Sequence, residues 1–217
     1  LTFHPEVNKI LDQMSKCSDI PHLMFYGPSG GGKKTRVSAL ITGIYKKPGK
    51  IHAETKVVQK TAPTASGGAA AVGPKIEINV VMSNCHLELN PSDVGSSQDK
   101  VSIQEVIKEI AASPPLNALA PFKTIVIHEA DRMSREAQDA LRRTMEKYSR
   151  TCRIILIATS ACRISAAIRS RCLQIRVPLP PQEQVVECVE TVARAEGVTL
   201  PETLAATIAK HSGGNVR

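Results

Sequence analysis

The decapeptide GPSGGGKKTR, residues 27–36, decides how the rest of the chain is interpreted. Its glycines and Lys33 match the pattern G-x-x-x-x-G-K-[ST], in which backbone N–H groups surround phosphates and the lysine reaches the outer phosphates. The next position of the pattern is a hydroxyl that ligates magnesium, and here it is Lys34. The stretch therefore predicts a phosphate-binding loop that lacks one of its metal ligands.

The residues on either side place this loop between a strand and a helix. HLMFY, residues 22–26, is a short apolar run that suits a buried parallel strand. Apolar residues at helical spacing after the loop predict a helix over 33–45. Strand, glycine loop and helix in this order form the context that supports the motif, and a glycine-rich turn with incidental lysines is the alternative.

Strand and helix signals continue to alternate along the chain. Further strands are predicted at KIEINVV (75–81), HLELN (86–90), KTIVI (123–127), RIILIAT (153–159) and CLQIRV (172–177). A capping box at Ser102 and Glu105 begins one helix, and a second helix is predicted over 135–148. Residues 61–74 have no periodicity and are expected to form a surface loop. The alternation predicts an α/β fold with a central parallel sheet flanked by helices.

The segment PLPP, residues 178–181, interrupts this alternation and is interpreted as a linker. Beyond it only helical signals remain, so we predict a nucleotide-binding core over 1–178 and a helical lid over 179–217. The lid stops where a third helix would begin, and the chain does not start with Met. We therefore expect the sequence to be a fragment with an incomplete lid.

Composition excludes several classes of protein. The net charge of +8 favours a polyanionic partner, although a generally basic surface gives the same number. Six scattered cysteines without a C-x-x-C pair suggest reduced thiols and argue against a zinc site. No apolar run approaches the roughly 20 residues that a membrane-spanning helix needs, so no membrane partner is expected.

A second motif, TIVIHEAD at residues 124–131, has an apolar strand that ends in acidic residues. Glu129 occupies the position of a water-activating base, but His128 replaces the carboxylate expected beside the metal. Imidazole is a poor Mg²⁺ ligand and an ammonium group is none. The losses at Lys34 and His128 predict a site with no metal ligands, which holds a nucleotide but hydrolyses it slowly or not at all. A register shift in which Thr35 supplies the hydroxyl is the alternative.

Three stretches, GPSGGGKKTR, ALRRTMEKYS (140–149) and IRSRC (168–172), resemble the small subunits of replication factor C, the AAA+ clamp loader. HLELNPSD (86–93) together with GKKT resembles the subunit type numbered three or five. The resemblance extends over the whole chain and is weakest across 46–74. It implies a P-loop AAA+ core, a helical lid, a further C-terminal collar domain, and ATP or ADP as the ligand.

The resemblance also implies roles for individual residues. Arg171 matches the arginine finger that reaches ATP held by a neighbouring subunit. Thr159 falls at the sensor-1 position, where the family commonly has Asn, and Arg217 at the sensor-2 position of the lid. Residues 1–4 align with the adenine pocket. The expected phosphate-loop contacts come from Gly27, Pro28, Ser29, Gly30, Gly31, Gly32, Lys33, Lys34, Thr35 and Arg36.

The partners implied by the resemblance are the other replication factor C subunits in a pentamer, the sliding clamp PCNA and primer–template DNA in the nucleus. Lys100, Lys108 and Arg135 are the candidates for contacts with DNA phosphates, and solvated surface charge explains each of them equally well. The expected function is to help load the clamp while supplying Arg171 to another site. A competent ATPase subunit and a scaffold with an empty site are the alternatives.

Overall fold

The computed structural model describes residues 3–17, 19–45, 54–61, 75–83, 86–94, 107–108 and 122–216. The helices are α1 (Pro5–Lys16), α2 (Lys33–Ile44), α5 (Arg135–Lys147), α6 (Ala166–Arg169), α7 (Gln182–Ala195) and α8 (Glu202–Ser212). The strands are β1 (His22–Tyr26), β2 (Glu54–Thr61), β3 (Lys75–Met82), β4 (His86–Leu89), β5 (Lys123–Ile127), β6 (Cys152–Ala158) and β7 (Cys172–Arg176). Short 3-10 turns are η1 (Pro91–Val94), η3 (Ala130–Arg132) and η4 (Ala161–Arg163).

The strands form one mixed sheet in the order β2-β3-β4-β5-β6-β1-β7. The pairs from β4 to β7 are parallel, which confirms the predicted parallel centre. The pairs β2–β3 and β3–β4 are antiparallel, so a two-stranded ribbon extends the sheet at one edge. Strand β2 was not predicted, because its adjacent valines break the alternation and its pairing partner lies beyond the 61–74 segment.

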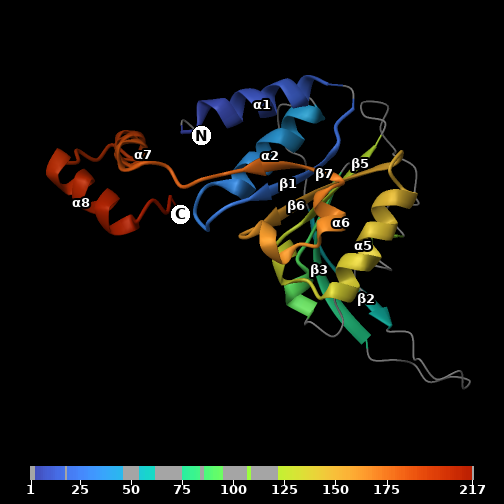
Figure 1. Cartoon of the computed structure of the whole chain (residues 1–217). Helices are drawn as coiled ribbons and strands as arrows, with labels where there is room; N and C mark the ends of the chain where they lie inside the picture. Colours follow the sequence, from blue (N-terminus) through green and yellow to red (C-terminus); the bar gives the residue numbers. More distant parts are fainter. Residues whose placement is uncertain are drawn as a thin grey trace, which may run out of the picture.

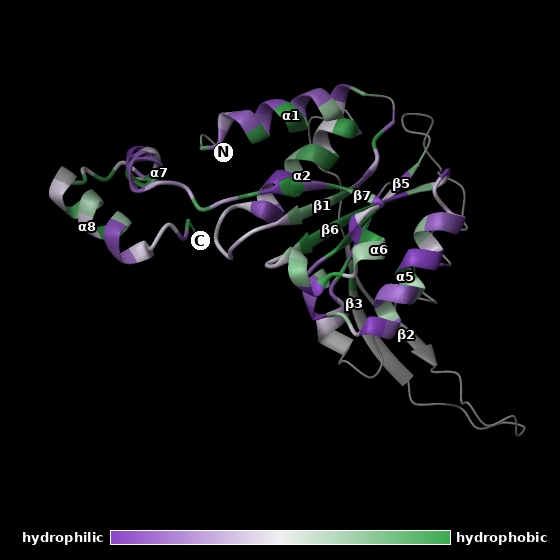
Figure 2. Ribbon diagram, viewed as in Figure 1, coloured by the Kyte–Doolittle hydropathy of each residue, from purple (hydrophilic) through white to green (hydrophobic). Residues whose placement is uncertain are grey.

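Helices cover both faces of the sheet and give the molecule three layers (Figure 1). Alternate residues of β1 point to opposite faces, as the pleat of a strand requires. Leu23 and Phe25 join a core beneath α1 and α2, and Met24 joins a second core beneath α5. Figure 2 shows the same division, with apolar strands between helices whose outer faces are hydrophilic.

The helix predicted from the capping box at Ser102 lies outside the described residues except for Ile107, which is buried in the α5-side core, and exposed Lys108. The two C-terminal helices, α7 and α8, pack against each other, and their role as a lid stays a prediction. The chain then returns to the glycine loop, where the Val216 N–H donates to the Gly30 carbonyl at 3.2 Å. The division of the chain at residue 178 stays a prediction.

Among the helices that the structure describes, none has both the length and the apolar character needed to cross a bilayer.

Candidate nucleotide-binding site

The glycine loop connects β1 to α2, as its sequence context predicted. Gly27 has φ +147° and Gly30 has φ +85°, which are backbone conformations that residues with side chains rarely adopt. A Cβ atom on Gly27 would lie 2.0 Å from the Val177 carbonyl oxygen, and one on Gly30 would lie 2.1 Å from Oδ1 of Asn215. Both glycines are therefore required by backbone angle and by close packing against the C-terminal part of the chain.

Lys33 is the first residue of α2 and is largely buried. Its ammonium group donates to the carbonyl oxygens of Gly27 at 2.6 Å and Pro28 at 2.7 Å. Burial lowers the pKa of Lys33, and the negative charge of Asp131 opposes this shift. The N-terminus of α2 adds unsatisfied backbone N–H groups to this charge, so the loop is built to accept an anion.

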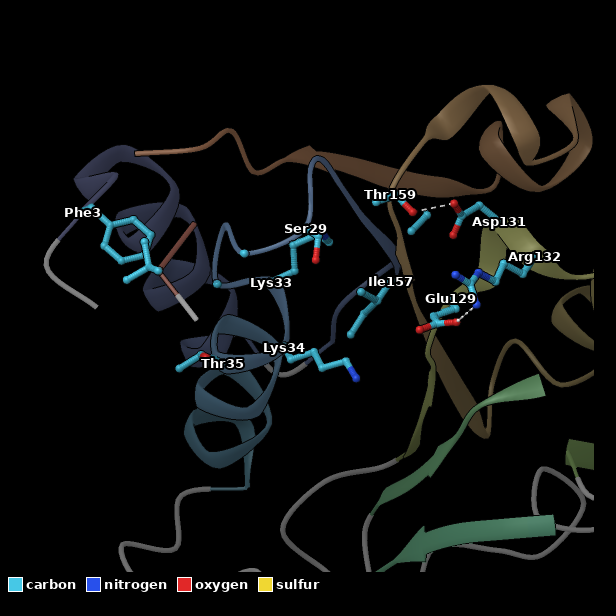
Figure 3. A pocket seen from close by; sticks show the side chains of 14 residues that line it. Phe3, Ser29, Lys33, Lys34, Thr35, Glu129, Asp131, Arg132, Ile157 and Thr159 are labelled. Atoms are coloured by element: carbon cyan, nitrogen blue, oxygen red, sulfur yellow. Dashed lines mark hydrogen bonds and ion pairs between the residues drawn. The ribbon is translucent and has the colours of Figure 1, made fainter. Parts of the chain in front are cut away.

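A cavity of about 460 Å³ opens in front of the loop (Figure 3). Its size is within the usual range for a small-molecule site. It is lined by Phe3, Ser29, Gly30, Gly32, Lys33, Lys34, Thr35, Glu129, Asp131, Arg132, Ile157, Ala158, Thr159 and Val216. The structure thus brings together eight of the predicted phosphate and catalytic residues, Phe3 from the segment aligned with the adenine pocket, and several residues that were not predicted.

Four predicted loop residues do not line the cavity: Gly27, Pro28, Gly31 and Arg36. The first three form the back of the loop. The Arg36 side chain is only 2% exposed and points under the loop, where it donates to the Gly31 carbonyl at 2.8 Å. It therefore supports the loop from below. Arg217 lies outside the described residues.

Lys34 and Thr35 differ in where they point. Figure 3 shows the Lys34 side chain extending toward Glu129, whereas Thr35 lies on the opposite side of the first turn of α2. The ammonium group of Lys34 faces the acidic side of the cavity. Thr35 also lines the cavity, so the register shift in which its hydroxyl serves a metal stays an alternative.

His128 does not line the cavity, because its side chain is paired with Glu88 of the neighbouring strand β4. The His128 Nε2 and Glu88 Oε2 atoms are 2.9 Å apart. This hydrogen bond lowers the pKa of Glu88, partial burial opposes the shift, and electrostatic interactions with His128, His86 and Lys34 lower the pKa further. The two residues that replace the metal ligands therefore share one carboxylate as a neighbour.

Asp131, a residue without a predicted role, lies in the cavity wall. Its side chain is 8% exposed, and its Oδ2 atom accepts a hydrogen bond from the Thr159 hydroxyl at 2.7 Å. Its Oδ1 atom is buried and has no hydrogen-bond partner among the described residues. Because the single Thr159 hydrogen is donated to Asp131, it is not free to contact a phosphate. The acidic residue two positions after Glu129 was the available sequence signal.

Glu129 also lines the cavity and is held by a neighbour. Its Oε2 atom lies 3.0 Å from Nη1 of Arg132, and both side chains are largely exposed. Its backbone has φ +49°, which turns the chain at the end of β5. The ion pair with Arg132 engages one oxygen of the Glu129 carboxylate at the wall of the cavity.

The donor set around the cavity suits phosphates better than Mg²⁺. Mg²⁺ takes oxygen ligands in near-ideal octahedral geometry, usually one or two carboxylates with waters and phosphates. On the loop side Lys34 offers no lone pair, and on the strand side His128 is turned away toward Glu88. The absence of a magnesium site between the loop and strand β5 stays a prediction, because the carboxylates of Glu129 and Asp131 line the same cavity.

Arg171 lies outside this cavity, directly before β7. The parallel pairing of β1 with β7 aligns His22 with Cys172 and Tyr26 with Arg176. Arg171 therefore lies beside the N-terminal end of β1, whereas the phosphate loop follows the C-terminal end of β1. The length of β1 separates them, about 13 Å at the usual rise per residue.

Of the predicted nucleic-acid contacts, Arg135 is exposed at the start of α5, Lys108 is exposed, and Lys100 lies outside the described residues. Arg135 lines a second cavity of about 420 Å³ together with Arg163 and Arg169. Sequence reasoning missed these two arginines, because only the fold brings the segment after β6 to the start of α5.

Comparison with known proteins identifies relatives over the whole chain. The family model described as DNA polymerase III, delta subunit, matches residues 3–181. A probable replication factor C subunit 3 of Dictyostelium discoideum is 44% identical over 100% of this chain and 60% of that protein. Replication factor C subunit 3 of Mus musculus is 43% identical over 100% of this chain and 59% of its own, and subunit 5 of Oryza sativa is 43% identical over 100% and 60%. The chain thus spans about 60% of the length of these relatives.

Among solved structures, two mutant forms of Thermotoga maritima RuvB match with TM-scores of 0.63 and 0.64. Each covers 99% of this chain and 58% of the RuvB chain at 15% identity, so the likeness concerns the fold, that of the P-loop AAA+ proteins. The chain therefore belongs to the DNA polymerase III delta-subunit family, a clamp-loader-type family with this fold, and resembles replication factor C subunits three and five.

Proposed function

We propose that this chain is a clamp-loader subunit that binds a nucleotide without depending on Mg²⁺ and serves ATP hydrolysis at a neighbouring subunit through Arg171. The complete assembly would contain the other replication factor C subunits and would load PCNA onto primer–template DNA in the nucleus. Membership of the clamp-loader family supports the general role.

One observation carries the proposed role of Arg171: it lies at the N-terminal end of the parallel strands, and its own phosphate loop lies at their C-terminal end. Cys172 pairs with the first residue of β1, and the loop follows the last. The side chain therefore cannot reach phosphates bound by its own loop. An exposed arginine so placed is available to another chain, where it would stabilise the charge that develops during phosphoryl transfer.

The nucleotide site would hold phosphates with the loop backbone, Lys33 and Lys34. Two ammonium groups near the N-terminus of α2 supply positive charge that a metal ion provides in other sites of this type. The positive charge of Lys34 also contributes to lowering the pKa of Glu88, the carboxylate that pairs with His128. ATP and ADP both satisfy this chemistry.

A second candidate, hydrolysis at this chain's own site, is favoured by Asp131. Its buried Oδ1 atom has no partner among the described residues and could accept from a metal-bound water. Glu129 would then be the base. The ion pair with Arg132 and the displacement of His128 weigh against this candidate.

Binding of DNA phosphates is assigned to the second cavity, at Arg135, Arg163 and Arg169. Three guanidinium groups around one hollow would track a phosphate backbone without reading its sequence. Exposed Lys108 remains a candidate as well. Such contacts weaken steeply as salt concentration rises.

The test is Arg171→Ala in the full-length subunit of a reconstituted loader, with PCNA and primed DNA present. The rate at the neighbouring site should fall by about 10³-fold or more, because an arginine finger typically contributes that much. Nucleotide binding at this chain's own loop should not change. Arg194→Ala, which removes an exposed arginine from α7, is the matched control. Unchanged turnover in Arg171→Ala would show that the residue does not act in trans.

A further inference from the structure

We propose that Glu146 is the positioning residue of Arg171, a role that rests on the proposed function of Arg171 in trans. The Glu146 carboxylate belongs to the last turn of α5, and Arg171 follows α6. These two helices pack against each other on the same face of the sheet (Figure 1). The contact therefore joins two residues, Glu146 and Arg171, that are 25 positions apart in the sequence.

The guanidinium group of Arg171 is held on two sides. Its Nη2 atom lies 2.6 Å from Oε1 of Glu146, and its Nη1 atom donates to the Ala167 carbonyl at 2.7 Å. A longer contact of 3.5 Å joins Nη1 to the Ser170 hydroxyl. Two short contacts on different nitrogen atoms fix the plane of the group, because a guanidinium has a rigid fork of donors.

These contacts leave part of the guanidinium free for a ligand. Arginine has five N–H donors, and the described residues accept from Nη1 and from one side of Nη2. The Nε hydrogen and one Nη2 hydrogen remain. The side chain is 38% exposed, so these donors can reach a group supplied by another chain.

The choice of partner supports a specific arrangement. Arg142 and Arg143 precede Glu146 by four and three residues on the same helix, where ion pairs form readily. The ion pair that Glu146 forms within the described structure is nevertheless with Arg171. Arg142 and Arg143 are nearer to Glu146 in the sequence, so local helix spacing alone does not account for its pairing with Arg171.

Preorganisation is the expected benefit of the contact. An arginine side chain has several rotatable bonds, and ordering it at the moment of reaction costs conformational entropy. A catalytic group gains rate when its orientation is fixed beforehand. Because both side chains are substantially exposed, solvent screens the pair, so Glu146 orients Arg171 without cancelling its charge.

The test is a double-mutant cycle in the reconstituted loader, using Arg171→Ala, Glu146→Ala and both together in the full-length subunit. Glu146→Ala should lower kcat of the loader's Arg171-dependent ATP hydrolysis about two- to fivefold, the range expected for an exposed ion pair, without changing KM for ATP. Glu146→Gln keeps a hydrogen-bond acceptor but loses the charge, so its kcat should lie between those of Glu146→Ala and the unmodified protein. Glu136→Gln, at an exposed site on the same helix, is the matched control.

In the Arg171→Ala background, Glu146→Ala should have no further effect. That result distinguishes positioning from a general structural role. If Glu146 were only structural, Glu146→Ala would lower kcat further in the Arg171→Ala background and would lower the melting temperature. If Arg171→Ala slows the loader but Glu146→Ala leaves its rate unchanged or raises it, Glu146 is not a positioning residue, although the trans role stands. If Arg171→Ala has no effect, the proposed function of Arg171 fails, and the role of Glu146 fails with it.

Discussion

Arg36 offers the sharpest test of how the phosphate loop is held in place, because it is buried beneath the loop without an acidic partner among the described residues. Its guanidinium donates to the carbonyls of Gly31 at 2.8 Å and Phe3 at 3.0 Å, and to Oδ1 of Asn8 at 3.3 Å. The guanidinium carbon also lies 4.7 Å from the centre of the Phe3 ring. Arg36→Ala would release the loop and the N-terminal segment together.

The size of the effect follows from these contacts. Hydrogen bonds to a charged group contribute about 1.5 kcal/mol or more each, so the three bonds amount to roughly 4–5 kcal/mol. Burial lowers the pKa of Arg36, which shows that part of this gain offsets the cost of desolvating its charge. The net loss in free energy of unfolding should be about 2–4 kcal/mol, or some 4–16 °C in melting temperature for a chain of this size.

The assay combines urea unfolding with titration of ADP. Arg36→Lys keeps the positive charge but cannot reproduce the fork, so it should recover less than half of the loss. Arg143→Ala, at an exposed position on α5, should change stability by no more than about 0.5 kcal/mol. If Arg36→Ala costs less than about 1 kcal/mol, or binds ADP normally, Arg36 does not support the loop as described.

Two further predictions concern Gly27 of the phosphate loop and His22 of strand β1. Gly27→Ala should lower the free energy of unfolding by about 2 kcal/mol or more and weaken nucleotide binding. Gly197→Ala is the control and should cost only about 1 kcal/mol, because φ is also positive there but no atom lies within 4 Å of the added Cβ. Equal losses in urea unfolding would contradict the close packing at Gly27. Burial and the charge of Arg153 lower the pKa of His22 from 6.5, and its Nδ1 accepts from the Ile154 N–H at 3.1 Å. The unfolded chain therefore binds a proton at His22 more tightly than the folded chain does. The stability contributed by neutral His22 is fully present above pH 6.5 and is lost as the pH falls through the lowered pKa of the folded state. The difference in free energy of unfolding between the unmodified protein and His22→Gln should shrink as the pH falls over that interval. A difference that does not change with pH would contradict the lowered pKa of His22.

The parts of the fold that depend on local pattern were predictable from the sequence. Strands β1 and β5, with the loop from Gly27, were found where apolar runs and glycines placed them. Strand β2 was not, because it is formed by pairing with β3 and carries no alternation of its own. Local sequence does not encode a pairing that the antiparallel partner supplies.

The same limit explains what was missed at the site. Glu88 is 40 residues from His128, and they meet because β4 and β5 are parallel neighbours. Asp131 meets Thr159 because β6 lies next to β5. The substitution at Lys34 could be read from the motif, but the carboxylate that the two substituted residues share could not.

Nucleotide affinity in the presence and absence of Mg²⁺ tests the central claim most directly. Titration of ADP into the purified protein, once with excess Mg²⁺ and once with EDTA, should give dissociation constants that agree within about twofold, because Lys33 and Lys34 supply the positive charge. Lys34→Thr combined with His128→Asp should make binding depend on the metal. A loss of affinity of about tenfold or more with EDTA in the unmodified protein, or no binding under either condition, would contradict a phosphate site that works without Mg²⁺.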